Sequence, residues 1–332
     1  MAGYNTIRGL RVKYLSADPA NPENGQVWYN AGTGNLRLDG IIQAGSWSSG
    51  GALPAARSTG AGFGIQTAAV YAGGQTPPGP GSTTTVEYDG TNWTAGGNLS
   101  AGRYEIGGTT AGTLTAGLVF GGNASPGYNA TAATEEYNGS SWTGGGNMAT
   151  TITFMGGSGV QTAAFSAGGR TPSNSNNSQE YNGSSWTNGN TINTTRQALI
   201  GMGTQAAGII AGGEAPNGGS NASETYNGNT WTNAPNMGTA RYRLSGSGSV
   251  ATACLIFGGR FNPPAADKAQ TEEFDGTSWT EKADLATARQ QLSGNRGTST
   301  SALAVGGIVS GQVTNTEEFT GATTVVKNIS VS

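Results

Sequence analysis

A repeat with a period of 44–48 residues runs through most of this chain. Its clearest mark is a Gly-Gly pair that closes an apolar run, and these pairs are Gly73-Gly74, Gly121-Gly122, Gly168-Gly169, Gly212-Gly213, Gly258-Gly259 and Gly306-Gly307. An aromatic residue follows each pair, namely Tyr88, Tyr137, Tyr181, Tyr226, Phe274 and Phe319. A tryptophan also recurs with the same period, at Trp47, Trp93, Trp142, Trp186, Trp231 and Trp279. We expect each unit to be one supersecondary element that buries its apolar faces only against its neighbours.

Each unit predicts four short strands. In the fifth unit the first strand is expected over 241–246 and the second over 251–257, with Cys254 as a small buried thiol. Between the third and fourth strands stands Asp-Gly or Asn-Gly, such as Asp275-Gly276, which favours a tight hairpin because a type I′ turn needs positive φ at both central residues. No segment shows a sustained period of 3.6 residues, so the repeat predicts all-β propeller blades instead of a helical solenoid.

The order of Arg, apolar strand, Gly-Gly, Tyr and Trp resembles the kelch repeat, and the resemblance covers roughly residues 47–321. It implies a kelch-like β-propeller of six four-stranded blades, with seven blades as the alternative. Two features depart from the family pattern. The spacing from Tyr to Trp is short, and no Trp follows Phe319 in the last unit.

Trp47 precedes the first complete unit and is the natural substitute for that missing residue. We therefore expect residues 41–48 to supply the outer strand of the last blade, the one that begins at Arg289. Such a closure would join the two ends of the repeat without a covalent bond and remove an exposed sheet edge. The alternative is a seventh, irregular blade built from residues 25–48 and the tail 323–332.

Residues 1–40 lie outside the repeat, so we expect an N-terminal arm there and a propeller over 41–332. A hairpin is expected within the arm, with Val27, Trp28 and Tyr29 on one of its strands. The string at 21–30 is similar to the attachment hairpin of many bacteriophage virion proteins, and with the kelch-like units behind it the chain resembles virion structural proteins of marine phages. The resemblance implies a fibre, tail or decoration component, present in several copies on the virion after synthesis in the host cytoplasm. It also implies contacts with other virion proteins through the arm. The alternative is a hairpin that only completes the propeller.

Composition excludes several classes of function. The chain has no His and one Cys, which removes Ser-His-Asp and Cys-His nucleophile systems and His-ligated metal sites. Lys and Arg are few and the net charge is −3, which argues against binding to nucleic acid. No apolar run is long enough to cross a bilayer. We expect no enzyme activity, no catalytic residues, no metal, no cofactor, no nucleic-acid partner and no membrane insertion.

The loops between the second and third strands vary while the strands repeat, and variable loops on a rigid repeat usually carry specificity. We expect them to lie on the same face as the Arg-bearing segments. Their Pro, Gly, Asn, Ser and Thr residues suit uncharged hydrogen bonding to a glycan or protein, and the candidate binding residues are Tyr128, Arg170, Arg260 and Phe261. The expected function is a non-enzymatic virion structural protein that presents a propeller to a host surface or a neighbouring subunit. The alternative is a carbohydrate-binding or glycan-hydrolysing propeller, since two carboxylates suffice for hydrolysis.

Overall fold

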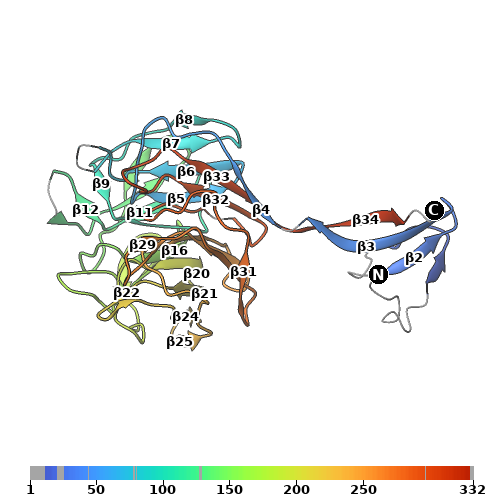
Figure 1. Cartoon of the computed structure of the whole chain (residues 1–332). Coiled ribbons are helices and arrows are strands. Elements are labelled where there is room, and N and C mark those ends of the chain that lie inside the picture. The colour runs from blue at the N-terminus through green and yellow to red at the C-terminus, as the bar shows by residue number, and fades with distance from the viewer. Residues whose placement is uncertain are drawn as a thin grey trace. The chain divides into compact units, whose positions relative to one another are not determined.

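The computed structural model describes residues 12–20, 26–43, 45–77, 79, 81–126, 129–295 and 297–329, and these contain strands and turns but no helix. The chain forms two compact units, Ser46–Thr320 and a smaller one that joins Met1–Gly45 to Gly321–Ser332 (Figure 1). This division differs from the expected boundary between residues 40 and 41. The reason is that β3 (Asn35–Gln43) continues past residue 40 and pairs with β34 (Thr323–Ile329), which ties the C-terminal segment to the N-terminal one.

Six antiparallel sheets follow one another in the described part of the larger unit. The first contains β5 (Ala61–Ile65), β6 (Ala68–Ala72), β7 (Thr85–Tyr88) and β8 (Trp93–Ala95). The second contains β10 (Gly107–Gly108), β11 (Gly117–Phe120), β14 (Thr134–Tyr137) and β15 (Trp142–Gly144). The third contains β16 (Gly156–Val160), β17 (Ala163–Ala167), β18 (Ser178–Tyr181) and β19 (Trp186–Asn188).

The remaining three sheets have the same order. The fourth contains β20 (Ile200–Thr204), β21 (Ala207–Ala211), β24 (Ser223–Tyr226) and β25 (Trp231–Ala234). The fifth contains β26 (Ser245–Ser247), β27 (Cys254–Phe257), β30 (Thr271–Phe274) and β31 (Trp279–Lys282). The sixth contains β32 (Ser301–Val305), β33 (Thr316–Thr320) and β4 (Ser46–Ser49). This last sheet has three strands where four were expected, because its first strand is reduced to a single bridge between Ser293 and Val305.

Strand β4 comes from the opposite end of the repeat and completes the sixth sheet. It pairs with β33, and Trp47 lies opposite Phe319. The indole of Trp47 packs against Phe319 and Phe257 and donates a hydrogen bond of 3.0 Å to Thr271 Oγ1 in the fifth sheet. The prediction that Trp47 shares a sheet with Phe319 is confirmed, although the strand is Ser46–Ser49 and not 41–48.

A ring of backbone hydrogen bonds closes the larger unit. One residue from each repeat has a positive φ of 52–58°, and each donates its N–H to the carbonyl of the preceding ring member at 2.7–3.2 Å. In order around this ring, called the central ring below, the residues are Thr59, Glu105, Phe154, Ala198, Arg243 and Gln291. The last bond runs from Thr59 N to Gln291 O, so the six repeats form a circle.

Side chains between neighbouring sheets hold the circle together. Trp186, for example, packs edge-on against Phe120 and donates its Nε1–H to Thr134 Oγ1 of the preceding sheet at 2.9 Å. Trp142 makes the same bond to Thr85 Oγ1, and Trp93 makes it to Thr316 Oγ1 of the sixth sheet. The tryptophans therefore join each of these sheets to the one before it, across the ends of the repeat as well.

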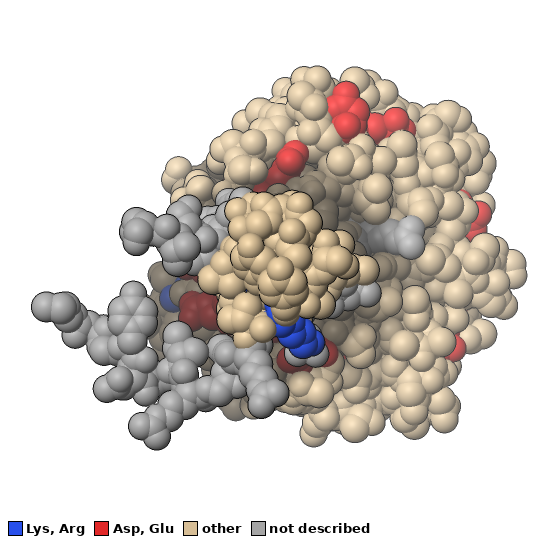
Figure 2. Space-filling model, turned by 90° about the vertical axis from the view of Figure 1, so that its right-hand side faces the viewer, with Lys and Arg blue, Asp and Glu red and all other residues tan. Residues whose placement is uncertain are grey.

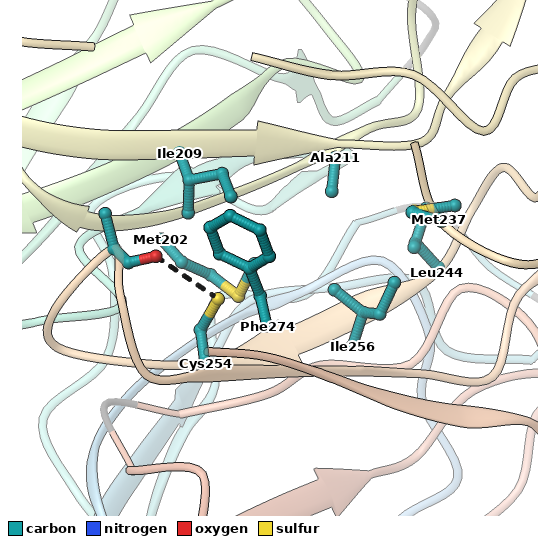
Figure 3. Close-up of a cluster of buried hydrophobic side chains, with 9 residues drawn as sticks. Met202, Ile209, Ala211, Met237, Leu244, Cys254, Ile256 and Phe274 are labelled. Atoms are coloured by element: carbon teal, nitrogen blue, oxygen red, sulfur yellow. Dashed lines mark hydrogen bonds between the residues drawn. The ribbon is translucent and has the colours of Figure 1, made fainter. Parts of the chain in front are cut away.

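Apolar clusters fill the space between sheets. In the cluster of Figure 3, Met202 and Ile209 of the fourth sheet meet Cys254, Ile256 and Phe274 of the fifth, and all five side chains are almost fully buried. Burial raises the pKa of the Cys254 thiol, as expected for a packing residue.

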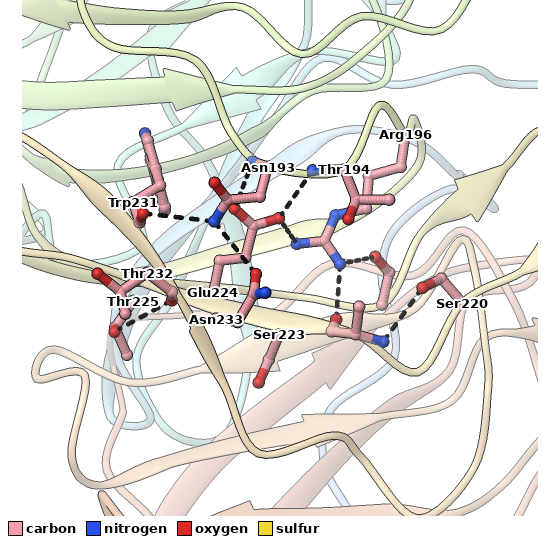
Figure 4. Close-up of polar contacts among 12 residues, drawn as sticks. Asn193, Thr194, Arg196, Ser220, Ser223, Glu224, Thr225, Trp231, Thr232 and Asn233 are labelled. Carbon is pink, nitrogen blue, oxygen red and sulfur yellow. Dashed lines mark hydrogen bonds and ion pairs between the residues drawn. The ribbon is translucent and has the colours of Figure 1, made fainter.

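The recurring Arg and Glu residues serve the sheets. A Glu precedes five of the six recurring aromatics, the exception being Tyr226, which follows Thr225, and by sequence pattern these Glu residues are the candidate partners of the recurring Arg. The Arg instead pairs with a buried Glu one position earlier, as Arg196 does with Glu224 at 2.9 Å (Figure 4). The later Glu points to the opposite face of the strand and accepts a bond from a neighbouring tyrosine; Tyr181 Oη donates to Glu136 Oε1 at 2.6 Å.

The smaller unit contains a sheet in the order β1 (Lys13–Leu15), β2 (Val27–Asn30), β3 and β34. Trp28 is fully buried, and its Nε1–H donates to Asp18 Oδ1 at 2.9 Å. Val27 and Tyr29 are half-buried. Of the three residues expected to mediate attachment, Trp28 is therefore not on the surface of this unit. The alternative pairing of 25–48 with the tail is present between β3 and β34, but in this separate unit and without Trp47.

Candidate binding face

The loops between the second and third strands lie beside the Arg-bearing segments, as expected from strand direction. Each such segment bridges to the residues after a Gly-Gly pair, for example Ser58 to Gln75 and Gln197 to Glu214. The Gly-Gly pairs are required because the chain passes very close to the Arg-bearing segment at these positions. Gly74 has a φ of 87°, and a Cβ there would lie 2.6 Å from the Ser58 carbonyl oxygen. The loops and the segments of all six repeats together form one face, called the loop face below.

Short hairpins order several of these loops. Strands β9 (Arg103–Tyr104), β12 (Asn123–Ala124) and β13 (Asn129–Ala130) form a small sheet in the second repeat. The fourth repeat has β22 (Glu214–Ala215) and β23 (Gly218–Gly219), and the fifth has β28 (Arg260–Phe261) and β29 (Ala266–Asp267).

The predicted binding residues fall in separate places on the loop face. Arg170 is exposed and donates its Nε–H to the Pro172 carbonyl at 3.0 Å. Arg260 pairs with Asp267 at 3.1 Å, and the ammonium of Lys268 lies 5.6 Å from the ring of Phe261. Tyr128 lies outside the described residues. No contact between Arg170 and Arg260 is described. The candidate binding residues predicted from the sequence therefore belong to two regions of the loop face, Arg170 to the third repeat and Arg260 to the fifth.

Arg170 borders an open groove of about 720 Å³ between the loops of the third and fourth repeats. Its described lining is Arg170, Pro172, Ser173, Asn174, Thr195, Gln197, Glu214, Ala215 and Pro216. Gln197 Nε2 donates to Glu214 Oε2 at 2.9 Å, and Asn174 Nδ2 donates to the Glu214 carbonyl at 2.9 Å. These bonds orient the carboxylate and amide groups along one wall of the groove.

A second hollow lies at the centre of the circle and encloses about 110 Å³. All six residues of the central ring line it, together with the first strands below them. Sequence reasoning missed this site. The one regularity that the sequence offers is position, because each ring residue stands two places after the recurring Arg, or after Ile152 in the third repeat.

Glu105 is the one carboxylate in the described lining of this central cavity. Burial raises the pKa of its carboxyl to about 7, and Arg243, a hydrogen bond from Asn123 and Arg170 each act in the opposite direction. The carboxyl thus changes charge near neutral pH.

No cluster of three or more His, Cys, Asp or Glu side chains suited to a metal ion occurs within the described ranges. The same residues include no helix that is long and apolar enough to span a membrane.

Comparisons with known proteins support the fold and no more. No family model matches the sequence, and no curated protein does. Among solved structures, the one titled "Structure of YjhT" is similar with a TM-score of 0.66 and 14% identity, over 83% of this chain and 99% of that one. At this identity the likeness shows architecture alone. Together with the repeated antiparallel sheets it identifies the larger unit as a β-propeller.

Proposed function

We propose that this chain is a non-enzymatic binding protein whose propeller has six blades, one for each sheet. In this proposal the loop face contacts a host-surface glycan or protein, or a neighbouring subunit. The observation that carries the proposal is the open groove beside Arg170. It is large enough for a sugar unit and lies where the repeats differ most.

The chemistry of the groove favours a glycan. Ser173, Asn174, Thr195 and Gln197 offer uncharged donors and acceptors, and Arg170 adds several donors at the rim. Such groups match the hydroxyls of a sugar. Figure 2 shows a different view of the surface, in which most side chains are uncharged and the acidic ones are scattered.

Binding without hydrolysis is the form of this function that we propose. Glycoside hydrolysis ordinarily needs two carboxyl groups on opposite sides of the scissile bond. The described lining of the groove contains one carboxylate, Glu214, and that of the central cavity contains one, Glu105. Neither described lining therefore offers the pair of carboxyl groups that hydrolysis needs.

The resemblance of residues 21–30 to a phage attachment hairpin extends the proposal to a virion component. The smaller unit would then dock on other particle proteins, in several copies per virion, while the kelch-like propeller faces outward. Crosslinking of intact particles tests this part by itself. Crosslinks from Lys13 to another virion protein would support it, and absence of the chain from purified particles would refute it.

A glycan array and a host-cell binding assay with the full chain test the loop face. We expect Arg170→Ala and Asn174→Ala each to weaken binding roughly tenfold, since each removes hydrogen bonds to the ligand. Lys282→Ala is the control, because it removes a cation that lies outside the groove and is not among the candidate binding residues. Binding by no glycan and no host cell, or loss of binding in the control variant alone, would overturn the assignment.

A further inference from the structure

The central cavity carries two opposite charges on opposite sides. Glu105 and Arg243 are three positions apart in either direction around the central ring, so they face each other across it. The other four ring residues are uncharged. The six ring positions are equivalent in backbone conformation but not in charge, because one carries an anion and the opposite one carries a cation.

Each charged group makes its described hydrogen bonds on its own side, and the two interact electrostatically without forming a described ion pair. Asn123 Nδ2 donates to Glu105 Oε2 at 2.5 Å. Arg243 Nη1 donates to Gln290 Oε1 at 3.2 Å, and its guanidinium carbon lies 5.8 Å from the centre of the Phe154 ring. None of the described ion pairs includes Glu105 or Arg243, and the buried Nε of Arg243 has no hydrogen-bond partner in the part of the chain that is described.

The volume of this partly open cavity suits a small occupant. A cavity of about 150 Å³ holds benzene, and this one encloses about 110 Å³. Glycine and alanine, with five and six non-hydrogen atoms, fit that limit. The described lining also includes the apolar residues Ile106, Leu199 and Leu244.

Charge then decides the class of ligand. A simple cation would be attracted by Glu105 but repelled by Arg243. A simple anion would be attracted by Arg243 but repelled by Glu105. A molecule with both charges satisfies both groups at once. We infer that the central cavity binds a small zwitterion, an α-amino acid of the size of glycine or alanine, with its ammonium at Glu105 and its carboxylate at Arg243.

Calorimetric titration of the full chain at pH 8 with glycine and with L-alanine tests this inference. Acetate and methylammonium serve as probes that carry one charge each. We expect saturable binding of the amino acids and affinities at least about tenfold lower for both single-charge probes, because each forfeits one charged hydrogen-bonding group. No saturable binding of either amino acid would show a cavity that holds water only, and equal affinity for acetate would show a simple anion site; both results would overturn the inference.

Variants locate the site. Glu105→Gln and Arg243→Gln should each lower the affinity for alanine by about tenfold to a hundredfold. Glu281→Gln removes an exposed carboxylate outside both the cavity and the groove and should leave this affinity unchanged. Thermal unfolding of each variant shows whether it is folded, and Arg243→Lys, which retains the charge, should recover part of the affinity. An unchanged affinity in folded Glu105→Gln would refute the assignment, whatever the outcome for the groove.

Discussion

Glu105 holds a carboxyl group largely out of water on a backbone with a φ of 55°, and both features cost free energy. Five further ring residues share this left-handed conformation, although only glycine adopts it without strain. The compensation is the closed circle of backbone hydrogen bonds, which each ring residue enters as donor and acceptor. At the residue scale, therefore, strain is placed where the six repeats meet.

The raised pKa of Glu105 predicts a specific pH dependence of stability. Its folded-state pKa is about 7, above the value of roughly 4.3 in an unfolded chain. The folded state thus binds more protons between these values, and the free energy of unfolding falls as the pH rises through this window. Glu105→Gln should match the parent near pH 4 and exceed it at pH 8 by on the order of 1–3 kcal/mol.

Denaturant unfolding at pH 4.5, 6 and 8 measures this difference. Glu214→Gln controls for the loss of one carboxyl group elsewhere on the loop face. A Glu105→Gln variant that keeps the pH dependence of the parent between pH 4.5 and 8 would contradict the prediction. The same curves show that the variant is folded where its ligand affinity is measured.

At the scale of the sheet, the buried Arg–Glu pair can be replaced by a neutral pair. Arg196 and Glu224 are almost fully buried in the fourth sheet, where the carboxylate also accepts the Asn193 N–H at 2.7 Å (Figure 4). The third sheet has Ile152 and Gln179 at the corresponding positions, and Gln179 exchanges hydrogen bonds with the Thr150 backbone at 3.2 and 3.3 Å. The third sheet therefore has neither the Arg nor the Glu charge, while its Gln179 side chain still bonds to the backbone of the preceding segment.

This comparison predicts the result of a double-mutant cycle. Arg196→Ile alone leaves the Glu224 carboxylate buried without its cation and should cost about 3–5 kcal/mol. Adding Glu224→Gln should recover most of that loss, to within about 1–2 kcal/mol of the parent, because the amide can bond to the backbone as Gln179 does. Equilibrium unfolding in urea measures the cycle. A double variant no more stable than Arg196→Ile would show that the charge pair itself is required.

Much of this architecture could be predicted from the sequence because it repeats. The period predicted the strands and the place of Trp47, since both follow from residues at fixed spacing. The prediction of type I′ turns at Asp-Gly and Asn-Gly was wrong, because only the glycines of these turns have positive φ. The Asp or Asn side chain instead accepts backbone bonds within a four-residue turn, as Asp275 Oδ1 does from the N–H groups of Thr277 and Ser278. The choice of Glu135 over Glu136 as partner of Arg103 depends on which face of the strand is buried, and the spacing alone left that open. The central ring escaped prediction because a positive φ at Glu105 or Arg243 has no local signature. The pairing of β3 with β34 joins the two ends of the chain, and no local pattern specifies such a contact.

At the scale of the whole molecule, the chain closes twice. Strand β4 completes the sixth sheet, while β3, which precedes it, pairs with β34 in the smaller unit. The last residue of the larger unit is Thr320, and its first is Ser46. All strands of the propeller therefore lie within 46–320, and the smaller unit contributes none of them.

Two fragments of the chain test separately how the β4–β33 pairing and the β3–β34 pairing contribute to stability. Fragment 46–320 keeps every propeller strand and should unfold cooperatively at nearly the temperature of the same unit in the full chain. Fragment 50–320 lacks β4 and with it Trp47, which packs on Phe257 and Phe319 and bonds to Thr271. Loss of a large aromatic in such a contact costs about 3–5 kcal/mol, so its Tm should fall by roughly 5–15 °C.

Calorimetry measures the Tm of each fragment, and light scattering measures self-association. Fragment 50–320 exposes the edge of β33, and we expect it to associate at concentrations where fragment 46–320 stays monomeric. Trp47→Ala within fragment 46–320 keeps the strand but removes the ring, so its Tm should lie between the two. Equal Tm values for the two fragments would show that the propeller does not depend on β4. Failure of fragment 46–320 to fold would show instead that the smaller unit is needed to hold the circle closed.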